Sequence, residues 1–180
     1  MTHARTTEAL QRPAPGTYRL QPDRCTVRFH TAHAFGLGPV HGTMAVREGT
    51  LVVDEEPERS SVTATIDAAS FTTDRPERDA KVRSKAFLDV EKHPTMSFTA
   101  AGVRTDASGP RLPGILTVHG VRAPVELTLA EIRGVPGGLR CRATARVDRY
   151  AFGVTAGRGL IRRYLEIELE IGAVAGPGSS

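Results

Sequence analysis

The chain contains no tryptophan, and aromatic residues make up only 5% of its 180 residues. It contains two cysteines, Cys25 and Cys141, which lie far apart in the sequence. Neither has a neighbouring cysteine or the ligand spacing of a zinc site. We therefore expect two free, buried thiols rather than a metal centre or a disulfide framework.

Long apolar runs are also absent. No run is long enough to cross a bilayer as a helix, so we expect no membrane span. The first residues, MTHARTTEALQRPAPG, carry charge but lack the apolar core of a secretory signal, which favours a cytoplasmic protein. The length fits one domain, expected at 16–175, between disordered tails at 1–15 and 176–180.

Lysine is scarce. Only three of the 24 basic residues are lysines, and the formal net charge is +4. The acidic residues are interspersed among the others, as in 165–171, LEIELEI. A nucleic-acid-binding protein more typically gathers its basic residues into a patch with stacking aromatic residues. We therefore expect no nucleic-acid partner.

The chain is rich in short stretches in which apolar and polar residues alternate. They are found at 17–20, 26–33, 40–48, 50–53, 61–67, 95–103, 112–119, 123–133, 139–148 and 164–173. Segments rich in glycine and proline, such as 36–39 and 136–138, separate them and are typical of turns. This spacing predicts an all-β domain, either an antiparallel sandwich or a barrel.

One segment departs from the alternation. Residues 77–87 place apolar residues among charged ones and contain no glycine or proline, which predicts a helix. Pro76 suits the first helical turn, and Pro94 marks a stop before the next strand. A single amphipathic helix among strands is expected to cover a sheet or close one mouth of a barrel.

The side chains on the inward faces of the predicted strands are small. Phe29 and Phe98 are among the few large rings, whereas most inward positions resemble Val27, Val62, Ala64, Val118, Ala143 and Ala145. A closed barrel of about eight strands is either filled by its side chains or holds one small ligand. Small inward residues favour a hollow tube, whose natural guest is a hydrocarbon chain. On the pattern alone, a solid sandwich fits equally well.

Four motifs carry a resemblance to a known family. The segment 78–94, RDAKVRSKAFLDVEKHP, resembles RDxHLRSxxFFDVExxP, and 114–121, GILTVHGV, resembles GxLTxHGV. Residues 148–154, DRYAFGV, resemble DRxxFGI, and His33 with Gly42 matches an earlier pair. Taken in chain order, the four motifs and the chain over roughly 16–173 resemble the YceI-like family of bacterial lipocalin-like proteins. The departures are Tyr18 for a tryptophan, Arg24-Cys25 for His-Ser, and Arg162-Arg163 for acidic or neutral residues.

The resemblance implies an antiparallel lipocalin-like β-barrel of about eight strands with a short helix near one mouth. It also implies a non-catalytic protein that carries a long-chain amphiphile, such as a polyisoprenoid, an isoprenoid quinone or a fatty acyl compound. A homodimer is a further expectation, and no cofactor is expected. The expected ligand-binding residues are Phe29, His33, Phe35, Arg78, Arg83, Phe87, Phe98, Val118 and Phe152.

Several of these residues have a second interpretation. Arg78 and Arg83 offer guanidinium groups to an anionic head group, or the two arginines and Asp79 fix the helix to the barrel rim through ion pairs, which we favour. His33 either meets the ligand or pairs with backbone. His30 and His33 lie on opposite faces of one strand and cannot share a metal ion, while His119 is expected to be a strand-end partner. We therefore predict no metal site.

The sequence also lacks the motifs of common enzymes. No serine lies in a nucleophile elbow and no glycine-rich phosphate loop is found. We therefore predict a binding protein rather than an enzyme. Two alternatives stay open: a barrel enzyme of the cyclase or isomerase kind that uses His33, and an interaction module with a solid barrel.

Overall fold

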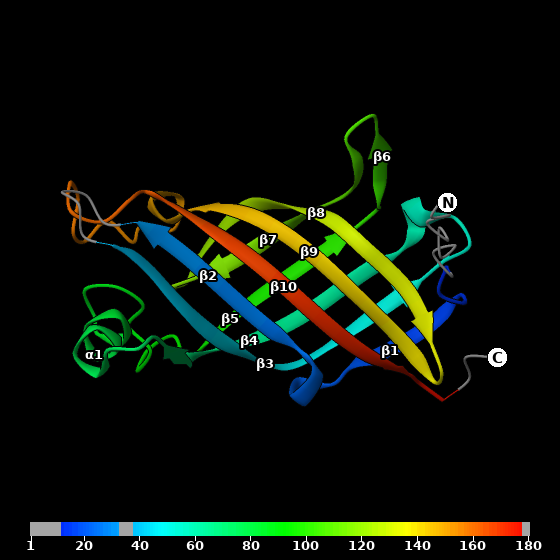
Figure 1. The fold of residues 1–180 in the computed structure, drawn as a ribbon, viewed down its shortest axis with the longest axis horizontal. Helices are drawn as coiled ribbons and strands as arrows, with labels where there is room; N and C mark the ends of the chain where they lie inside the picture. Colours follow the sequence, from blue (N-terminus) through cyan, green and yellow to red (C-terminus); the bar gives the residue numbers. More distant parts are fainter. Residues whose placement is uncertain (1–11, 33–37, 178–180) are drawn as a thin grey trace, which may run out of the picture.

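The computed structural model describes residues 12–32 and 38–177, which form an antiparallel β-barrel (Figure 1). The strands are β1 (Gly16–Leu20), β2 (Thr26–Ala32), β3 (Pro39–Val53), β4 (Ser61–Thr72), β5 (Thr95–Ala101), β6 (Arg104–Asp106), β7 (Gly109–Val118), β8 (Val121–Val135), β9 (Gly138–Asp148) and β10 (Tyr164–Ala175). The helical elements are α1 (Pro76–Arg83) and the 3-10 turns η1 (Pro22–Arg24), η2 (Pro57–Arg59) and η3 (Arg149–Phe152).

The barrel closes through β10. This strand pairs with β9 over 11 residue pairs and with β2 over five, and the remaining neighbours complete the ring β2-β3-β4-β5-β7-β8-β9-β10. The strand β1 pairs with β10 and β3 beyond the end of β2, so β1 and β2, separated by η1, occupy one position in the ring. The predicted all-β barrel of about eight strands with one helix is therefore confirmed.

Alternation of side chains fixes which face of each strand lies inward. In β10 the apolar side chains line the interior, while the glutamates between them face outward. Glu170 lies 3.2 Å from Arg28 of β2 and 3.4 Å from Arg142 of β9, and Glu166 lies 3.5 Å from Arg146. Such exposed ion pairs stabilise little individually, but a one-residue slip would bury this charged row and so the register is well determined.

Several predicted boundaries differ from the structure; β4, for example, was expected at 61–67 and continues to Thr72. The stretches 40–48 and 50–53 form the single strand β3, because Gly49 does not form a turn. It lies instead where strands approach closely: a Cβ there would be 2.5 Å from Leu20 Cδ1 and 2.6 Å from the Thr63 carbonyl oxygen. The helix was expected to reach Phe87 but ends at Arg83, because the Ser84 hydroxyl donates to the Lys81 carbonyl and closes the last turn.

The two ends of the barrel differ. The end formed by β1 and neighbouring strands is filled by a cluster of buried residues that includes Tyr18, Leu20 and Leu139. At the opposite end lie α1, the β7–β8 turn and the segment between β9 and β10 (Figure 1). An opening for a ligand is therefore expected at the α1 end. Among the described residues, no helix is long and apolar enough to cross a membrane.

Candidate ligand-binding site

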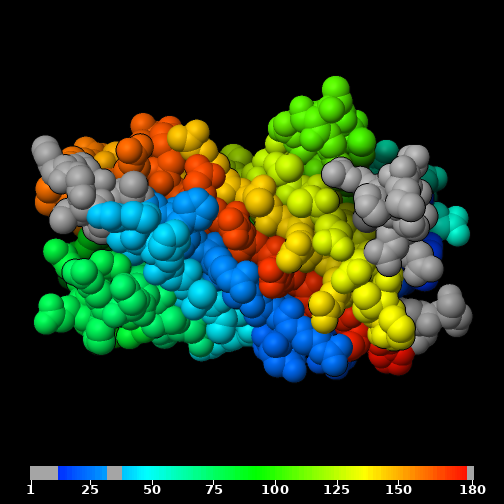
Figure 2. Space-filling model, in the orientation of Figure 1, coloured from blue at the N-terminus to red at the C-terminus, as the bar shows by residue number. Residues whose placement is uncertain are grey.

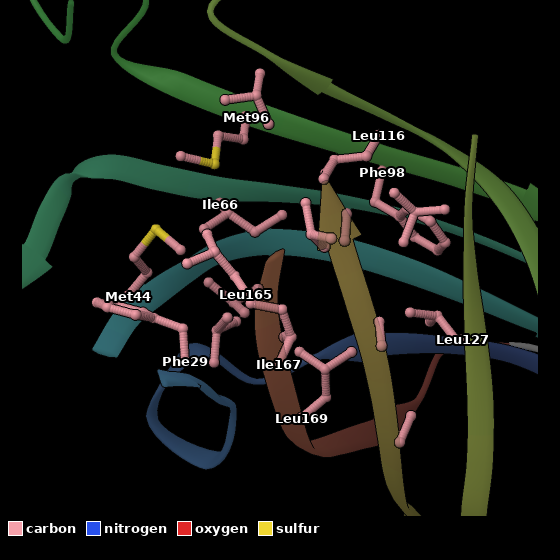
Figure 3. A pocket seen from close by; sticks show the side chains of 18 of the residues that line it. Phe29, Met44, Ile66, Met96, Phe98, Leu116, Leu127, Leu165, Ile167 and Leu169 are labelled. Atoms are coloured by element: carbon pink, nitrogen blue, oxygen red, sulfur yellow. The ribbon is translucent and has the colours of Figure 1, made fainter. Parts of the chain in front are cut away.

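A cavity of about 300 Å³ lies inside the barrel, and the surface that it exposes is apolar. Its walls include side chains from all eight strands of the ring and from α1. Figure 3 shows phenylalanine, methionine, leucine and isoleucine side chains from different strands surrounding this space. The volume lies at the lower end of the range for small-molecule sites. The structure therefore contains the hollow apolar interior that the small inward residues predict.

Small side chains leave room on two opposite sides of the barrel, on β9 and on β4. β9 contributes Ala143 and Ala145, which are paired with Leu169 and Ile167 of β10. β4 contributes Ala64 opposite Phe98 of β5. Each alanine faces a larger neighbour, so the lumen stays open where two large residues in register would have filled it.

Glycines hold the large rings against the wall. A Cβ at Gly42 would be 2.2 Å from Phe29 Cζ, and a Cβ at Gly114 would be 2.5 Å from Phe98 Cζ. Each ring thus occupies the space of the side chain that the neighbouring strand lacks. The Phe29 ring also stacks on Phe71, with ring centroids 4.7 Å apart. These contacts keep the rings from crossing the lumen.

Two arginines reach the cavity wall. The Arg149 guanidinium donates to the carbonyl oxygens of Val154, Ala156, Ile161 and Arg162 at 2.7–3.1 Å, and burial lowers its pKa. These bonds fold the segment between β9 and β10, so Arg149 is fully engaged. Arg78 of α1 has one partner among the described residues, Asp74 at 3.4 Å. Of the two arginines on the cavity wall, Arg78 is therefore the one with donors to spare for a head group.

Hydrogen bonds rather than ion pairs fix α1 to the barrel. The buried Asp79 carboxylate accepts from the Thr73 backbone N–H at 2.9 Å, from the Thr73 hydroxyl at 2.6 Å and from the Thr72 hydroxyl at 3.3 Å. Burial alone would raise the pKa of Asp79, but these bonds and the charge of Arg83 hold it below its usual value. Arg83 donates to the carbonyl of Phe71. The helix is thus anchored to the end of β4 by hydrogen bonds to threonine side chains and to the backbone, and not by the ion pairs that were expected.

The predicted site residues fall into three groups. Phe29, Arg78, Phe87, Phe98 and Val118 line the cavity. Arg83 points to the end of β4 instead, and Phe152 is buried in the core at 2% exposure, so neither belongs to the wall. His33 and Phe35 lie outside the described residues.

The prediction missed most of the wall. Inward positions of β10 and the methionines of β3 and β5 line the cavity but were not named as binding residues: Met44, Met96, Leu165, Ile167 and Leu169. The alternation along β10 already indicated that Leu165, Ile167 and Leu169 lie inward, since they share one face of the strand. Met44 lies within the first of two register shifts of β3 against β4, between Thr43 and Ala45, and these shifts obscure the alternation.

Both cysteines are free thiols, as predicted, and Cys141 lines the cavity. Burial raises the pKa of Cys141 to about 11. Its thiol is therefore protonated at neutral pH and is a poor nucleophile.

Three residues from separate parts of the sequence meet at the α1 end. Asp89, His93 and His119 place one ligand atom each within 4.8 Å of the others. The prediction of no metal site rested on His30 and His33 and treated His119 as a strand-end partner, and it stays untested. Asp89 and His93 lie in the motif 78–94 and His119 lies in the motif 114–121. The sequence does not show that these motifs meet, because the β7–β8 turn that carries His119 reaches Asp89 only in the folded barrel.

Comparison with known proteins identifies the family of this chain. Residues 18–174 match the family described as the YceI-like domain. The chain belongs to the YceI-like family. It is 30% identical over 161 residues to a UPF0312 protein of Serratia proteamaculans (strain 568), covering 86% of this chain and 83% of the relative. It is 31% identical over 155 residues to Protein YceI of Salmonella arizonae, covering 82% and 80%.

Solved structures share the family's barrel. The crystal structure of Burkholderia cenocepacia BcnA superposes with a TM-score of 0.69 at 20% identity, covering 86% of this chain and 99% of that one. A polyisoprenoid binding domain from Saccharophagus degradans superposes with a TM-score of 0.63 at 14% identity, covering 88% and 98%. At these identities the likeness shows the fold.

Proposed function

We propose that this protein binds and carries a long-chain amphiphile, with the hydrocarbon tail in the barrel and the polar head at the α1 mouth. The observation that carries the proposal is the apolar cavity of about 300 Å³ enclosed by the ring of strands. The likeness to a domain named for polyisoprenoid binding supports it. Polyisoprenoids, isoprenoid quinones and fatty acyl compounds have the required tail.

Burial of the tail supplies the binding free energy. Each methylene removed from water contributes about 0.8 kcal/mol, without the need for specific contacts. At the mouth, Arg78 lines the cavity and offers a planar set of donors to a phosphate, carboxylate or carbonyl head. We therefore expect affinity to grow with tail length and to depend only moderately on the head group.

The wall supports a carrier rather than an enzyme. Its ionisable groups among the described residues are Arg78, Arg149 and Cys141. Arg149 is engaged by four carbonyls, and the raised pKa of Cys141, about 11, keeps its thiol protonated. This set does not provide the nucleophile, base and orienting group that catalysis by side chains requires. A barrel enzyme that uses His33 stays the alternative.

Uptake of an apolar fluorescent probe tests the proposal. Native mass spectrometry of freshly purified protein is expected to show a copurifying long-chain molecule, and delipidated protein is expected to take up the probe. Ala145→Phe places a ring in the lumen and should reduce probe affinity at least tenfold. Thr144→Phe, one residue away on the exposed face, is the matched control and should bind as wild type does. Empty protein that takes up no probe would refute the proposal, and turnover of a bound lipid would favour the enzyme.

The cytoplasmic location and the homodimer stay predictions from the sequence. At the end of the barrel that carries the β9–β10 segment, Phe152 is buried, whereas Tyr164 is 39% exposed and open to a partner surface. Size-exclusion chromatography with light scattering would measure the oligomeric state.

A further inference from the structure

Two buried aspartates in the described residues differ in their partners. Asp79 and Asp89 are 5% and 8% exposed. Asp79 accepts three hydrogen bonds from Thr72 and Thr73. The Asp89 carboxylate accepts none from the described part of the chain, and the Nε2 of His119 lies 4.0 Å from its Oδ2. That distance is too long for a hydrogen bond. A buried carboxylate is costly without donors or a cation.

The surroundings of Asp89 are those of a cation site. The His93 and His119 rings lie 5.0 Å apart in an edge-on arrangement, and one ligand atom from each of the three residues lies within 4.8 Å of the others. The backbone N–H of His93 donates to the Asp89 carbonyl at 2.8 Å, which sets the His93 side chain beside the carboxylate. Gly120 makes room for it, since a Cβ there would be 3.0 Å from His93 Cε1.

The backbone at this cluster is held in an uncommon conformation. Asp89 has φ of 47° and His119 has φ of 54°, and in residues 12–32 and 38–177 they are the two non-glycine residues with positive φ. Such conformations persist where surrounding structure imposes them, often at functional sites. Both fixed positions direct a side chain toward the same point.

We propose that Asp89, His93 and His119 bind a divalent transition-metal ion of the zinc type. Two imidazoles and one carboxylate are a ligand set typical of Zn²⁺, which prefers four ligands and would keep one position open. Tetrahedral bonds bring ligand atoms to roughly 3.4 Å from one another, so binding draws the three groups closer together. His93 and His119 are partly exposed and can make this movement. Because Leu88 and Val118 line the cavity, the ion lies beside the barrel mouth.

Metal titration of the purified full chain, after treatment with a chelator, tests the site. Isothermal titration with Zn²⁺ is expected to show one equivalent bound, and Co²⁺ is expected to give visible d–d bands of a tetrahedral site. Asp89→Asn and His93→Phe should each weaken Zn²⁺ at least tenfold. His93→Phe keeps an aromatic ring beside Gly120, so it tests binding even where the aspartate variant folds poorly.

A second pair of histidines provides the control. His30 and His41 lie on neighbouring strands with ring centroids 6.0 Å apart. His41→Phe should leave the affinity for Zn²⁺ unchanged. No uptake of metal by the wild-type protein, equal affinity in the wild type and His93→Phe, or loss of binding in His41→Phe would each overturn the proposal.

A different observation concerns the segment 149–163, which joins β9 to β10. It contains four arginines and no acidic residue. Arg158 and Arg162 are exposed and have no acidic partner among the described residues, unlike Arg28 and Arg146 of the barrel wall, which pair with glutamates. Leu160, between them, is 59% exposed. Figure 2 shows this orange segment at the same end of the molecule as green α1.

From this segment we infer that residues 156–163 dock on an anionic lipid bilayer. Exposed cations around an apolar side chain match the interface of such a bilayer, where arginine meets the head groups and leucine enters the acyl boundary. Ile161 and Val154 of the same segment line the cavity, so docking sets the barrel mouth against the lipid. The consequence that cargo enters there rests on the proposed function; the docking itself does not.

Sedimentation with lipid vesicles tests the docking. Delipidated protein should bind vesicles that contain phosphatidylglycerol and bind pure phosphatidylcholine at least fivefold less. Leu160→Ser and the pair Arg158→Ser/Arg162→Ser should each reduce the bound fraction several-fold. The pair Arg19→Ser/Arg140→Ser removes the same charge from exposed positions on β1 and β9 and should bind normally. Equal binding of all variants, or of both vesicle types, would overturn the inference, while probe uptake by the same variants reports separately on the cavity.

Discussion

The Phe29 ring occupies the space in which a Gly42 side chain would lie, since a Cβ at Gly42 would be 2.2 Å from Phe29 Cζ and 2.6 Å from the Thr72 carbonyl oxygen. The two residues are register partners on β2 and β3, with side-chain positions on the same face. Phe98, whose register partner is Leu116, fills the space at Gly114 in the same way. Such close approaches let an eight-stranded barrel contain phenylalanines without being plugged by them.

Gly42→Ala is therefore expected to affect binding and stability together. The added methyl group forces Phe29 toward the lumen, which should reduce probe affinity at least threefold and lower the free energy of unfolding by about 1–3 kcal/mol. Urea unfolding and probe titration measure the two effects. Gly38→Ala is the control, because nothing lies within 4 Å of a Cβ at Gly38. Unchanged probe affinity in Gly42→Ala would show that the ring does not border the ligand.

Replacement of Arg149 by lysine should loosen the segment 153–163. Lysine keeps the charge but cannot reach four carbonyls with one planar group, so we expect a loss of roughly 2–4 kcal/mol in the free energy of unfolding. Hydrogen exchange should rise at the amides of 154–162. Arg158→Lys, exposed on the same segment, should change stability by less than about 0.5 kcal/mol. Equal effects of the two variants would contradict the role given to Arg149.

Asp79→Ala should detach α1 from β4. Loss of three hydrogen bonds is expected to lower the free energy of unfolding by roughly 1–3 kcal/mol. Exchange should rise in 76–83 before the barrel unfolds. A matched change at exposed Asp74→Ala removes the weak partner of Arg78 and should have little effect on stability.

Acid should destabilise the protein through Asp79 and Asp148. The pKa of Asp148 is lowered chiefly by a hydrogen bond from Arg163, and that of Asp79 is also lowered. The unfolded chain therefore binds more protons than the folded one in acid. The stabilisation is fully present above the ordinary aspartate pKa of about 3.9 and is lost as the pH falls through the folded-state values. Between pH 6 and pH 2, the free energy of unfolding should fall less steeply in the double variant Asp79→Asn/Asp148→Asn than in the wild type.

Bound cargo should protect one thiol selectively. The pKa of Cys141, about 11, leaves roughly one thiol in a thousand ionised at pH 8, so reaction with a maleimide should be slow in the folded protein. Cys141 lines the cavity and Cys25 does not, so loading with lipid should slow modification of Cys141 further and leave Cys25 unchanged. Mass spectrometry of peptides measures both rates. Equal protection of the two would indicate a general tightening of the barrel instead.

The barrel could be predicted because its signal is local and repeated. Alternation along β9 and β10 assigns inward and outward faces residue by residue, and small residues such as Ala143 indicate a hollow interior. The motif around Arg78 located the helix at a mouth. These features depend on neighbours in sequence or on a simple period, which a single chain displays.

The features that could not be predicted from the sequence depend on contacts between distant segments. Gly49 looked like a break between two strands. It lies instead within one strand, where the Leu20 side chain from another strand leaves no room for a side chain. Arg83 looked able to bind an anion, but the backbone carbonyl of Phe71 accepts from it, and only the fold shows that this carbonyl comes within reach. The meeting of Asp89 with His119 likewise depends on where the β7–β8 turn lies in space.

Closure of the ring through β9 and β10 also governs how copies of this protein could associate. Every strand of the ring has partners on both sides, so none presents a row of unpaired backbone groups to another molecule. The strand outside the ring, β6, is three residues long and carries Arg104 and Asp106, which makes it a poor template for a growing sheet. A dimer must therefore assemble through side chains, and the barrel is protected by its own geometry against the edge-to-edge stacking that leads to fibrils.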